Sequence, residues 1–243
     1  MRDYAEEFSK RVEFIRQTVS DARSDGIIFA NSGGKDCVLA GILCKAACER
    51  TLSVIMPCES RRNYNEDKQD ALLFAEKFGI ETITVDLTST KRDLSEKISD
   101  HITITPHSGA NIAPRLRMVT LYAIGNSMNY LVAGTGNKSE IHMGYFTKWG
   151  DGAYDFNPIA DLTVTEVYEF LKHLKAPESI INKPPSAGLF DGQTDEEDMG
   201  VTYAQIDNYI KTGTGTPEAI GIIERYHNQS THKRRMPLSY DPR

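Results

Sequence analysis

The chain has 243 residues, a formal net charge of −6 and 40% hydrophobic residues, which is the composition of a globular protein with one large domain rather than of a disordered chain. A mildly acidic chain has no overall attraction for nucleic acid, no apolar run approaches the roughly 20 residues that span a bilayer, and the charged N-terminus lacks the apolar region of a signal peptide. We therefore expect a cytoplasmic protein, a single domain over residues 1–243, with neither nucleic acid nor a membrane as a partner.

Helical and strand-like segments alternate along the chain. Apolar residues recur at helical spacing from Tyr4 to Val19, and a short apolar run at 26–30 then precedes a glycine-rich turn and a helix expected over 38–47. Further strands are expected at 52–56, 80–87 and 130–133, and further helices near 71–75, 114–126, from Thr163 onward and from Thr216 onward. Three polar stretches, 57–65, 89–113 and 186–201, lack a clear period, so we interpret them as loops.

This alternation favours an α/β fold, namely a doubly wound parallel sheet flanked by helices in a single domain. Right-handed crossovers bring the carboxyl ends of all the strands to one edge of such a sheet, where ligands bind. The two most distinctive motifs follow the first and the fourth predicted strands. We therefore expect the binding site at that edge.

The first motif, SGGKDC at 32–37, lies between a strand and a helix. Its two glycines let the backbone approach a ligand closely, and the amides at a helix N-terminus attract an anion. The motif is not a Walker loop, which requires a different glycine spacing and a Ser or Thr after the lysine. A carboxylate such as Asp36 is repelled by phosphates unless a cation lies between them, and Mg²⁺ is the natural cation there. The motif therefore predicts a nucleotide phosphate site with Mg²⁺.

The second motif begins after the fourth predicted strand. Thr135 and Gly136 can meet a nucleotide, and Glu140 can supply a second carboxylate to the metal. The following segment, 144–155, contains three glycines, one lysine, two aspartates and the only tryptophan of the chain. A loop that only connects two elements rarely needs such a mixture, so we interpret it as part of the site.

These motifs resemble those of a known family. The first loop resembles the pyrophosphate loop SGGxDS of the ATP pyrophosphatases, with Cys37 in place of the last serine. The pattern GTxNxSE followed by GYxTKxGDGxxDxxPI looks like that of the NAD synthetases. Segments 115–118, 185–196 and 232–237 also match in order, so the resemblance runs from about Ser32 to Pro237. It points to the NH₃-dependent NAD synthetases, which are N-type ATP pyrophosphatases.

The resemblance implies an adenine nucleotide α-hydrolase-like fold and a two-step reaction. The nicotinate carboxylate of deamido-NAD attacks the α-phosphate of ATP to give an adenylate and pyrophosphate, and ammonia then displaces AMP to give NAD, in the last step of NAD biosynthesis. It also implies a homodimer. Glutamine-using relatives carry an amidase domain ahead of this one, and no such domain precedes Ser32, so we expect ammonia to be used directly.

The resemblance also assigns roles to individual residues. The expected ATP-binding residues are Asn31, Ser32, Gly33, Gly34, Lys35, Asp36, Cys37, Thr135 and Ser186. The expected deamido-NAD-binding residues are Arg115, Lys148, Asp155, His232 and Lys233. Asp36 and Glu140 are the expected metal ligands and, with Lys148 and Asp151, the expected catalytic residues. Asp151 would steer or deprotonate ammonium.

Two other interpretations remain open from the residues alone. Some tRNA-modifying pyrophosphatases carry SGGKDS, but they usually add Cys-x-x-Cys pairs or a basic extension, and neither occurs here. A nucleotide-binding module without turnover would agree with two departures from the family pattern, Cys37 and Val164. The products separate the three interpretations: NAD with AMP supports the synthetase, AMP formed only with tRNA supports the tRNA-modifying enzyme, and binding without products supports the module without turnover.

The second departure leads to a prediction. The family usually has a lysine that contacts ATP where this chain has Val164, and we expect Lys35, in the phosphate loop, to compensate. The change Lys35→Ala should therefore raise the Michaelis constant for ATP in steady-state assays, because a cation near the phosphates is lost. Unchanged ATP kinetics in this variant would rule out the compensation.

Overall fold

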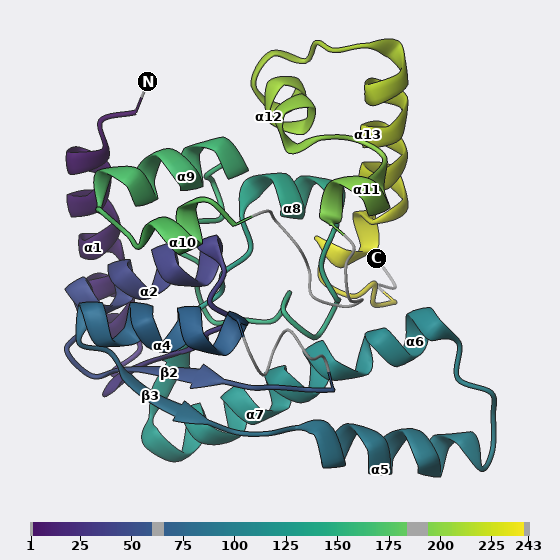
Figure 1. Ribbon diagram of the computed structural model, residues 1–243, viewed down its shortest axis with the longest axis horizontal. Coiled ribbons are helices and arrows are strands. Elements are labelled where there is room, and N and C mark those ends of the chain that lie inside the picture. The colour runs from purple at the N-terminus through teal and green to yellow at the C-terminus, as the bar shows by residue number, and fades with distance from the viewer. Residues whose placement is uncertain (1, 60–65, 184–193, 241–243) are drawn as a thin grey trace.

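A single parallel sheet forms the centre of the molecule (Figure 1). The computed structural model describes residues 2–59, 66–183 and 194–240. The sheet has the strand order β3-β2-β1-β4, and its strands are β1 (Gly26–Ala30), β2 (Thr51–Ile55), β3 (Glu81–Thr84) and β4 (Tyr130–Val132). In the register of the sheet, Ile28 pairs with Leu52 of β2 on one side and with Val132 of β4 on the other. The chain reverses its direction of travel across the sheet at the β1–β4 boundary, which is where open α/β sheets bind ligands.

Helices cover both faces of the sheet. One face packs against α1 (Tyr4–Asp21), α2 (Lys35–Ala47), α4 (Glu66–Phe78), α9 (Val164–His173) and α10 (Glu178–Ile181). The other face packs against α7 (Ile112–Met128). Strand β1 shows why both faces need cover: Ile27 and Phe29 point into the first cluster and Ile28 into the second, and all three are fully buried. The predicted doubly wound α/β fold is confirmed.

A third apolar cluster lies beside the sheet. It joins α8 (Lys138–Met143) and the start of α9 to α11 (Asp195–Met199), α12 (Tyr203–Thr212) and α13 (Pro217–Gln229), which is followed by the short helix η1 (Thr231–Lys233). Figure 1 shows these C-terminal helices stacked next to α8. The capping box expected at Thr163 and Glu166 is present, and similar boxes begin α8, α11 and α12.

One predicted loop is wrong. The stretch 89–113 contains α5 (Thr88–Ser99), α6 (Pro106–Ala110) and the start of α7. Helix α5 buries none of its residues, so its sequence lacks the apolar face by which helices are recognised. The third predicted loop also contains a helix, α11, and its part over 186–193 lies outside the described residues. In the part of the chain that the structure describes, no helix is long and apolar enough to cross a membrane.

The turn after α8 couples this helix to the C-terminal segment. Gly144 ends α8 with a φ of +65°, and a Cβ added there would lie 2.0 Å from the Cβ of Ser230. The Ser230 hydroxyl donates to the Tyr226 carbonyl at 2.6 Å, so it is anchored in the last turn of α13. The left-handed backbone at Gly144 and the contact with Ser230 both disfavour a side chain at this position.

This geometry predicts a destabilised Gly144→Ala variant. We expect a loss of about 2–4 kcal/mol in the free energy of unfolding, because the left-handed backbone and the contact with Ser230 both oppose the methyl group. Gly79→Ala is the matched control: Gly79 has a φ of +64° and nothing within 4 Å of an added Cβ. It should lose only about 1 kcal/mol. Equal losses in urea denaturation of the two variants would contradict the contact.

Candidate active site

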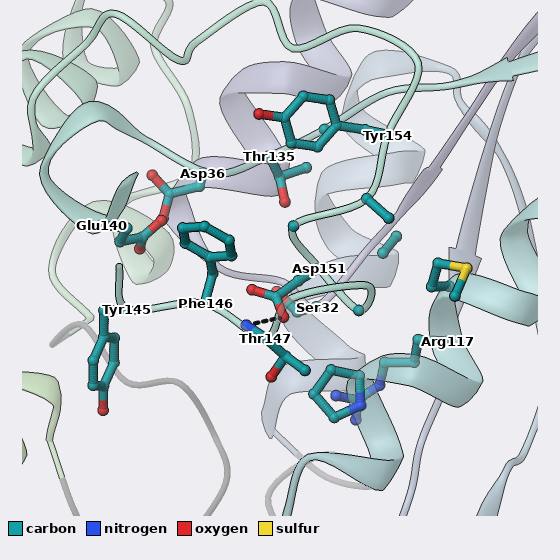
Figure 2. A pocket seen from close by; sticks show the side chains of 18 of the residues that line it. Ser32, Asp36, Arg117, Thr135, Glu140, Tyr145, Phe146, Thr147, Asp151 and Tyr154 are labelled. Carbon is teal, nitrogen blue, oxygen red and sulfur yellow. Dashed lines mark hydrogen bonds between the residues drawn. The ribbon is translucent and has the colours of Figure 1, made fainter. Parts of the chain in front are cut away.

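A cavity of about 1240 Å³ opens at the carboxyl edge of the sheet. Its walls come from the loops after β1 and β4, from α7 and α8, and from the C-terminal segment around η1. Figure 2 shows side chains of the two loops facing each other across it. Both motifs singled out in the sequence therefore contribute to one cavity.

The loop after β1 is shaped to receive an anion. Gly33 has a φ of +71°, and an added Cβ would lie 2.4 Å from the Asp67 carbonyl oxygen, so only glycine fits there. Asn31 is buried and holds the turn, because its side chain accepts from the Gly33 amide at 3.2 Å and donates to the Ala71 carbonyl at 3.1 Å. Helix α2 then starts without a side-chain cap, which leaves the amides of its first turn for a phosphate.

Cys37 lies on the inner side of this loop. Its Sγ donates to the Gly34 carbonyl at 3.1 Å and lies 3.5 Å from the Ser32 hydroxyl. Burial raises the pKa of the Cys37 thiol, with the hydrogen bonds from this loop opposing the shift. A thiol that stays protonated supports the loop but is a poor nucleophile.

The two predicted metal ligands lie close together. Figure 2 shows Asp36, from the first turn of α2, next to Glu140, from α8. Lys35 Nζ lies between them, 2.7 Å from Asp36 Oδ2 and 3.8 Å from Glu140 Oε1. The Asn137 side-chain amide donates to Asp36 Oδ1 at 3.0 Å, and the Asn137 backbone amide donates to Glu140 Oε2 at 3.1 Å. One asparagine thus orients both carboxylates.

Burial and neighbouring charges shift the pKa values of this group. Burial and then the Asp36 carboxylate raise the pKa of Glu140 to about 8, although Lys35 opposes the shift. Burial alone would lower the pKa of Lys35, but Asp36 and Glu140 together raise it above its usual value. Two carboxylates therefore share one ammonium, and Glu140 tends to keep a proton that a divalent cation at this position would displace.

The donor set fits Mg²⁺ that arrives with a nucleotide. Mg²⁺ is usually held by one or two carboxylates together with phosphate oxygens and water, and Asp36 and Glu140 supply two carboxylates. Among the described residues, no group of three or more His, Cys, Asp and Glu side chains could hold a metal ion. Phosphate oxygens and water would complete the coordination.

The 144–155 loop forms the opposite wall. Asp151 Oδ1 accepts from the Thr147 amide at 3.0 Å, as the dashed line in Figure 2 shows, and the Thr147 hydroxyl donates to Asn111 at 2.6 Å. Asp151 opens onto the cavity, yet desolvation by the surrounding protein raises the pKa of its carboxyl and outweighs the hydrogen bond from Thr147. Thr135 lines the same cavity, as expected from the sequence.

Four of the five predicted dinucleotide contacts lie together at one end of the cavity. Lys148 Nζ donates to the His232 carbonyl at 2.9 Å, and Arg115 donates to the Lys148 carbonyl at 3.4 Å. Lys233 Nζ donates to the carbonyls of Gly144 and Phe146, both at 2.7 Å. The C-terminal η1 segment, far from the first motif in sequence, is thereby fastened to the second motif and lines the site.

One predicted site residue, Asp155, is placed differently, and another falls on a part of the chain that is not described. Asp155 does not line the cavity: its carboxylate accepts from the Tyr122 hydroxyl at 3.1 Å and from the Val132 amide at 2.7 Å, so it closes the edge of β4. Ser186 lies outside the described residues.

Arg117 is a cavity residue that the sequence interpretation missed. Its side chain is half-buried, its Nε donates to the Met56 carbonyl at 3.1 Å, and desolvation lowers its pKa (Figure 2). The sequence did contain an indication of this role, because Arg117 follows Arg115 by two residues in the Arg-x-Arg-Met segment. A spacing of two places both residues within one turn of α7, although only the first was assigned to the site.

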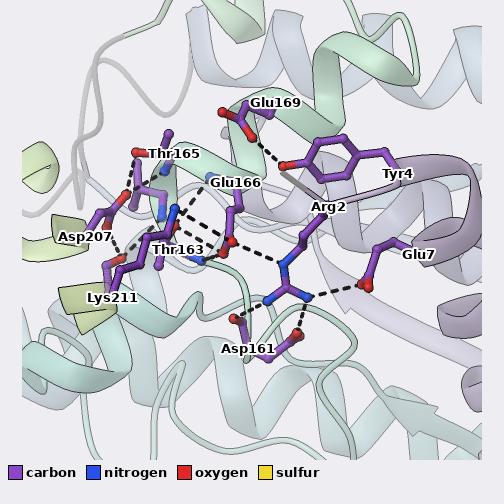
Figure 3. A network of polar contacts seen from close by, with 12 residues as sticks. Arg2, Tyr4, Glu7, Asp161, Thr163, Thr165, Glu166, Glu169, Asp207 and Lys211 are labelled. Atoms are coloured by element: carbon purple, nitrogen blue, oxygen red, sulfur yellow. Dashed lines mark hydrogen bonds and ion pairs between the residues drawn. The ribbon is translucent and has the colours of Figure 1, made fainter.

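A polar network holds α8, and with it Glu140, in position. Asp207 of α12 is buried and accepts from the Ser139 hydroxyl at 2.5 Å and from the Thr165 amide at 2.8 Å. Figure 3 shows this aspartate beside the start of α9, where Glu166 pairs with Arg2 at 3.1 Å. The network links α8, α9, α12 and the N-terminus, so the position of Glu140 depends on the whole helical layer.

Comparison with known proteins agrees with this geometry. The sequence model of the NAD synthase family matches residues 7–237. A relative from Carboxydothermus hydrogenoformans, named NH(3)-dependent NAD(+) synthetase, is 44% identical over 241 residues and covers 97% of each chain. An NMN synthetase structure from Francisella tularensis has a TM-score of 0.94 at 34% identity. An NH3-dependent NAD synthetase structure from Campylobacter jejuni has a TM-score of 0.84 at 28% identity. Both alignments cover 99% of this chain and 100% of the other chain. The motifs, the cavity and these matches agree, and the chain belongs to the NAD synthase family.

Proposed function

We propose that this chain amidates deamido-NAD with ammonia, using ATP, to give NAD, AMP and pyrophosphate. The observation that carries the proposal is the pairing of Asp36 and Glu140 at the mouth of an anion-binding loop. Carboxylates in that position repel phosphates unless a divalent cation neutralises them. Nucleotidyl transfer requires such a cation, because negative charge builds up on the departing pyrophosphate. The relatives named NH(3)-dependent NAD(+) synthetase support this choice of acceptor.

The first step requires that the negative charge of the phosphates be neutralised. A nicotinate carboxylate oxygen attacks the α-phosphorus, the bond from that phosphorus to the bridging oxygen breaks, and pyrophosphate leaves. The amides of the first turn of α2 would hold the departing pyrophosphate, with Ser32 and Thr135 as further contacts at the cavity wall. Mg²⁺ held by Asp36 and Glu140 would supply the positive charge that stabilises the leaving group.

The second step needs a proton acceptor. The nitrogen of ammonia attacks the acyl carbon, the bond to AMP breaks, and a proton must leave the nitrogen. Asp151 faces the cavity, and the upward shift of its pKa makes it a better proton acceptor than an ordinary aspartate. Lys148, Arg115 and the η1 residue Lys233 would surround the dinucleotide phosphates with positive charge, with His232 lining the same wall.

Three expectations complete this proposal. We expect a homodimer that uses α7, where Val119 is an exposed apolar side chain with a relative accessibility of 57%. We also expect ammonia to serve directly as the nitrogen donor, and the protein to work in the cytoplasm. Asp155 and Ser186 remain predicted substrate contacts.

A second acceptor is favoured by one observation. The structure named as an NMN synthetase has a higher TM-score, 0.94, than the Campylobacter jejuni NAD synthetase, at 0.84. The same chemistry on nicotinic acid mononucleotide would give NMN, because the reacting nicotinate carboxylate is identical. Deamido-NAD differs from nicotinic acid mononucleotide only by its AMP half, which is distant from the reacting atoms.

A product assay tests both candidates. The protein is mixed with ATP, Mg²⁺, ammonium and either deamido-NAD or nicotinic acid mononucleotide, and products are identified by mass spectrometry. We expect NAD, AMP and pyrophosphate from deamido-NAD, and little turnover when glutamine replaces ammonium. A larger kcat/KM with the mononucleotide would establish the second candidate. AMP that forms only when tRNA is added, or binding without any product, would contradict both.

The metal ligands give a separate prediction. Asp36→Asn and Glu140→Gln should each lower kcat/KM roughly 100-fold or more, because a ligand that neutralises the leaving group is lost. Glu49→Gln is the control, since Glu49 is an exposed carboxylate that pairs with Lys45 beyond the far end of α2. Circular dichroism must show that the variants fold. Synthesis at the unaltered rate in the double variant would contradict the proposed metal site.

A further inference from the structure

Lys35 occupies an unusual place for a lysine side chain. Only 7% of its surface is exposed, and its ammonium lies between Asp36 and Glu140 with its Nζ 5.7 Å from the centre of the Tyr203 ring. The side chain belongs to the first residue of α2, so its stem starts inside the phosphate loop. It is therefore a cation at the point where the proposed function requires a metal ion.

The hydrogen bonds of the two carboxylates divide their oxygens into two sets. Asp36 Oδ1 and Glu140 Oε2 both accept from Asn137, at 3.0 and 3.1 Å. The other two oxygens, Asp36 Oδ2 and Glu140 Oε1, both face Lys35 Nζ. An ion that bridges the carboxylates would use the oxygens that Asn137 does not hold. The ammonium thus covers the same two oxygens that a divalent cation would need.

We propose that Lys35 is a tethered cation that keeps the metal position filled until ATP brings a divalent ion. When the nucleotide and its metal arrive together, the ammonium would turn to a phosphate oxygen and leave Asp36 and Glu140 to hold the ion. A lysine suits this exchange, because its ammonium has three donors on a flexible stem and can change partners without moving the helix. The inference rests on the proposed metal role of Asp36 and Glu140.

This role has a consequence for metal binding that an ordinary structural ion pair lacks. Without nucleotide, a divalent ion must displace a buried ammonium and leave it without a partner, which is costly. With nucleotide, the displaced ammonium gains a phosphate oxygen. Metal affinity should therefore be low for the free protein and high in the presence of ATP, and Lys35 should be the cause of the difference.

Mn²⁺ binding measured by electron paramagnetic resonance tests this. The free Mn²⁺ signal is titrated with the whole chain, with and without α,β-methylene-ATP, whose α–β bridge is not cleaved, and the Mn²⁺ that the analogue binds without protein is subtracted. We expect the native chain to bind Mn²⁺ well only with the analogue. Lys35→Met should bind Mn²⁺ without the analogue roughly tenfold or more tightly than the native chain does, because the competing charge is gone. Lys35→Gln serves as a second neutral variant.

Two controls separate charge from shape. Lys35→Arg keeps the positive charge and should still bind Mn²⁺ weakly without the analogue. Lys45→Met removes a lysine from the other end of the same helix, where it pairs with Glu49, and should behave as the native chain. Thermal unfolding shows whether each variant is folded.

The outcomes separate this inference from the function on which it rests. Equal Mn²⁺ binding by the native chain and both neutral variants without nucleotide would overturn the role of Lys35, as would Lys35→Arg behaving like Lys35→Met. If an Asp36→Asn, Glu140→Gln double variant still bound Mn²⁺ tightly with the analogue, the proposed metal site itself would be wrong.

Discussion

The site depends on holding two carboxylates close together in a place with little water. Burial first, and then the Asp36 carboxylate, raise the pKa of Glu140, while Lys35 opposes both effects. Asn137 fixes both side chains by using its backbone and side-chain amides at once. The same asparagine caps α8, so the bond that begins the helix also aims its glutamate.

The remaining structure supports α8 from two sides. Asp207 holds its N-terminal half through Ser139, and Arg234 donates to the carbonyls of Ile141 and His142 at its C-terminal half, both at 3.3 Å. Lys233 holds the loop that follows. Cations near the last carbonyls of a helix also interact favourably with its dipole. The C-terminal segment therefore holds α8 and the following loop in position and also forms part of the cavity wall.

The arrangement of the two motifs follows from the order of the strands. Strands β1 and β4 are neighbours in the sheet although β2 and β3 separate them in the chain. The turns that follow them therefore face each other across the point where the order reverses. The bridge between Ala133 and Phe156 extends this edge and brings the 144–155 loop back over the cavity.

The sequence by itself determined the features that are encoded locally. Strand periodicity, the capping pair Thr163 and Glu166, and the glycine needed at position 33 can be read from neighbouring residues, because backbone conformation depends on them directly. Helix α5 was not predicted, because none of its residues is buried against the core.

Only the tertiary structure decided which charged groups meet. That Lys35 faces Glu140, that Arg117 lines the cavity, and that Asp155 turns instead to Tyr122 depend on contacts between elements far apart in the chain. A charged residue looks alike in a sequence whether it is solvated or paired, since its partner comes from another element. The fold alone selects that partner.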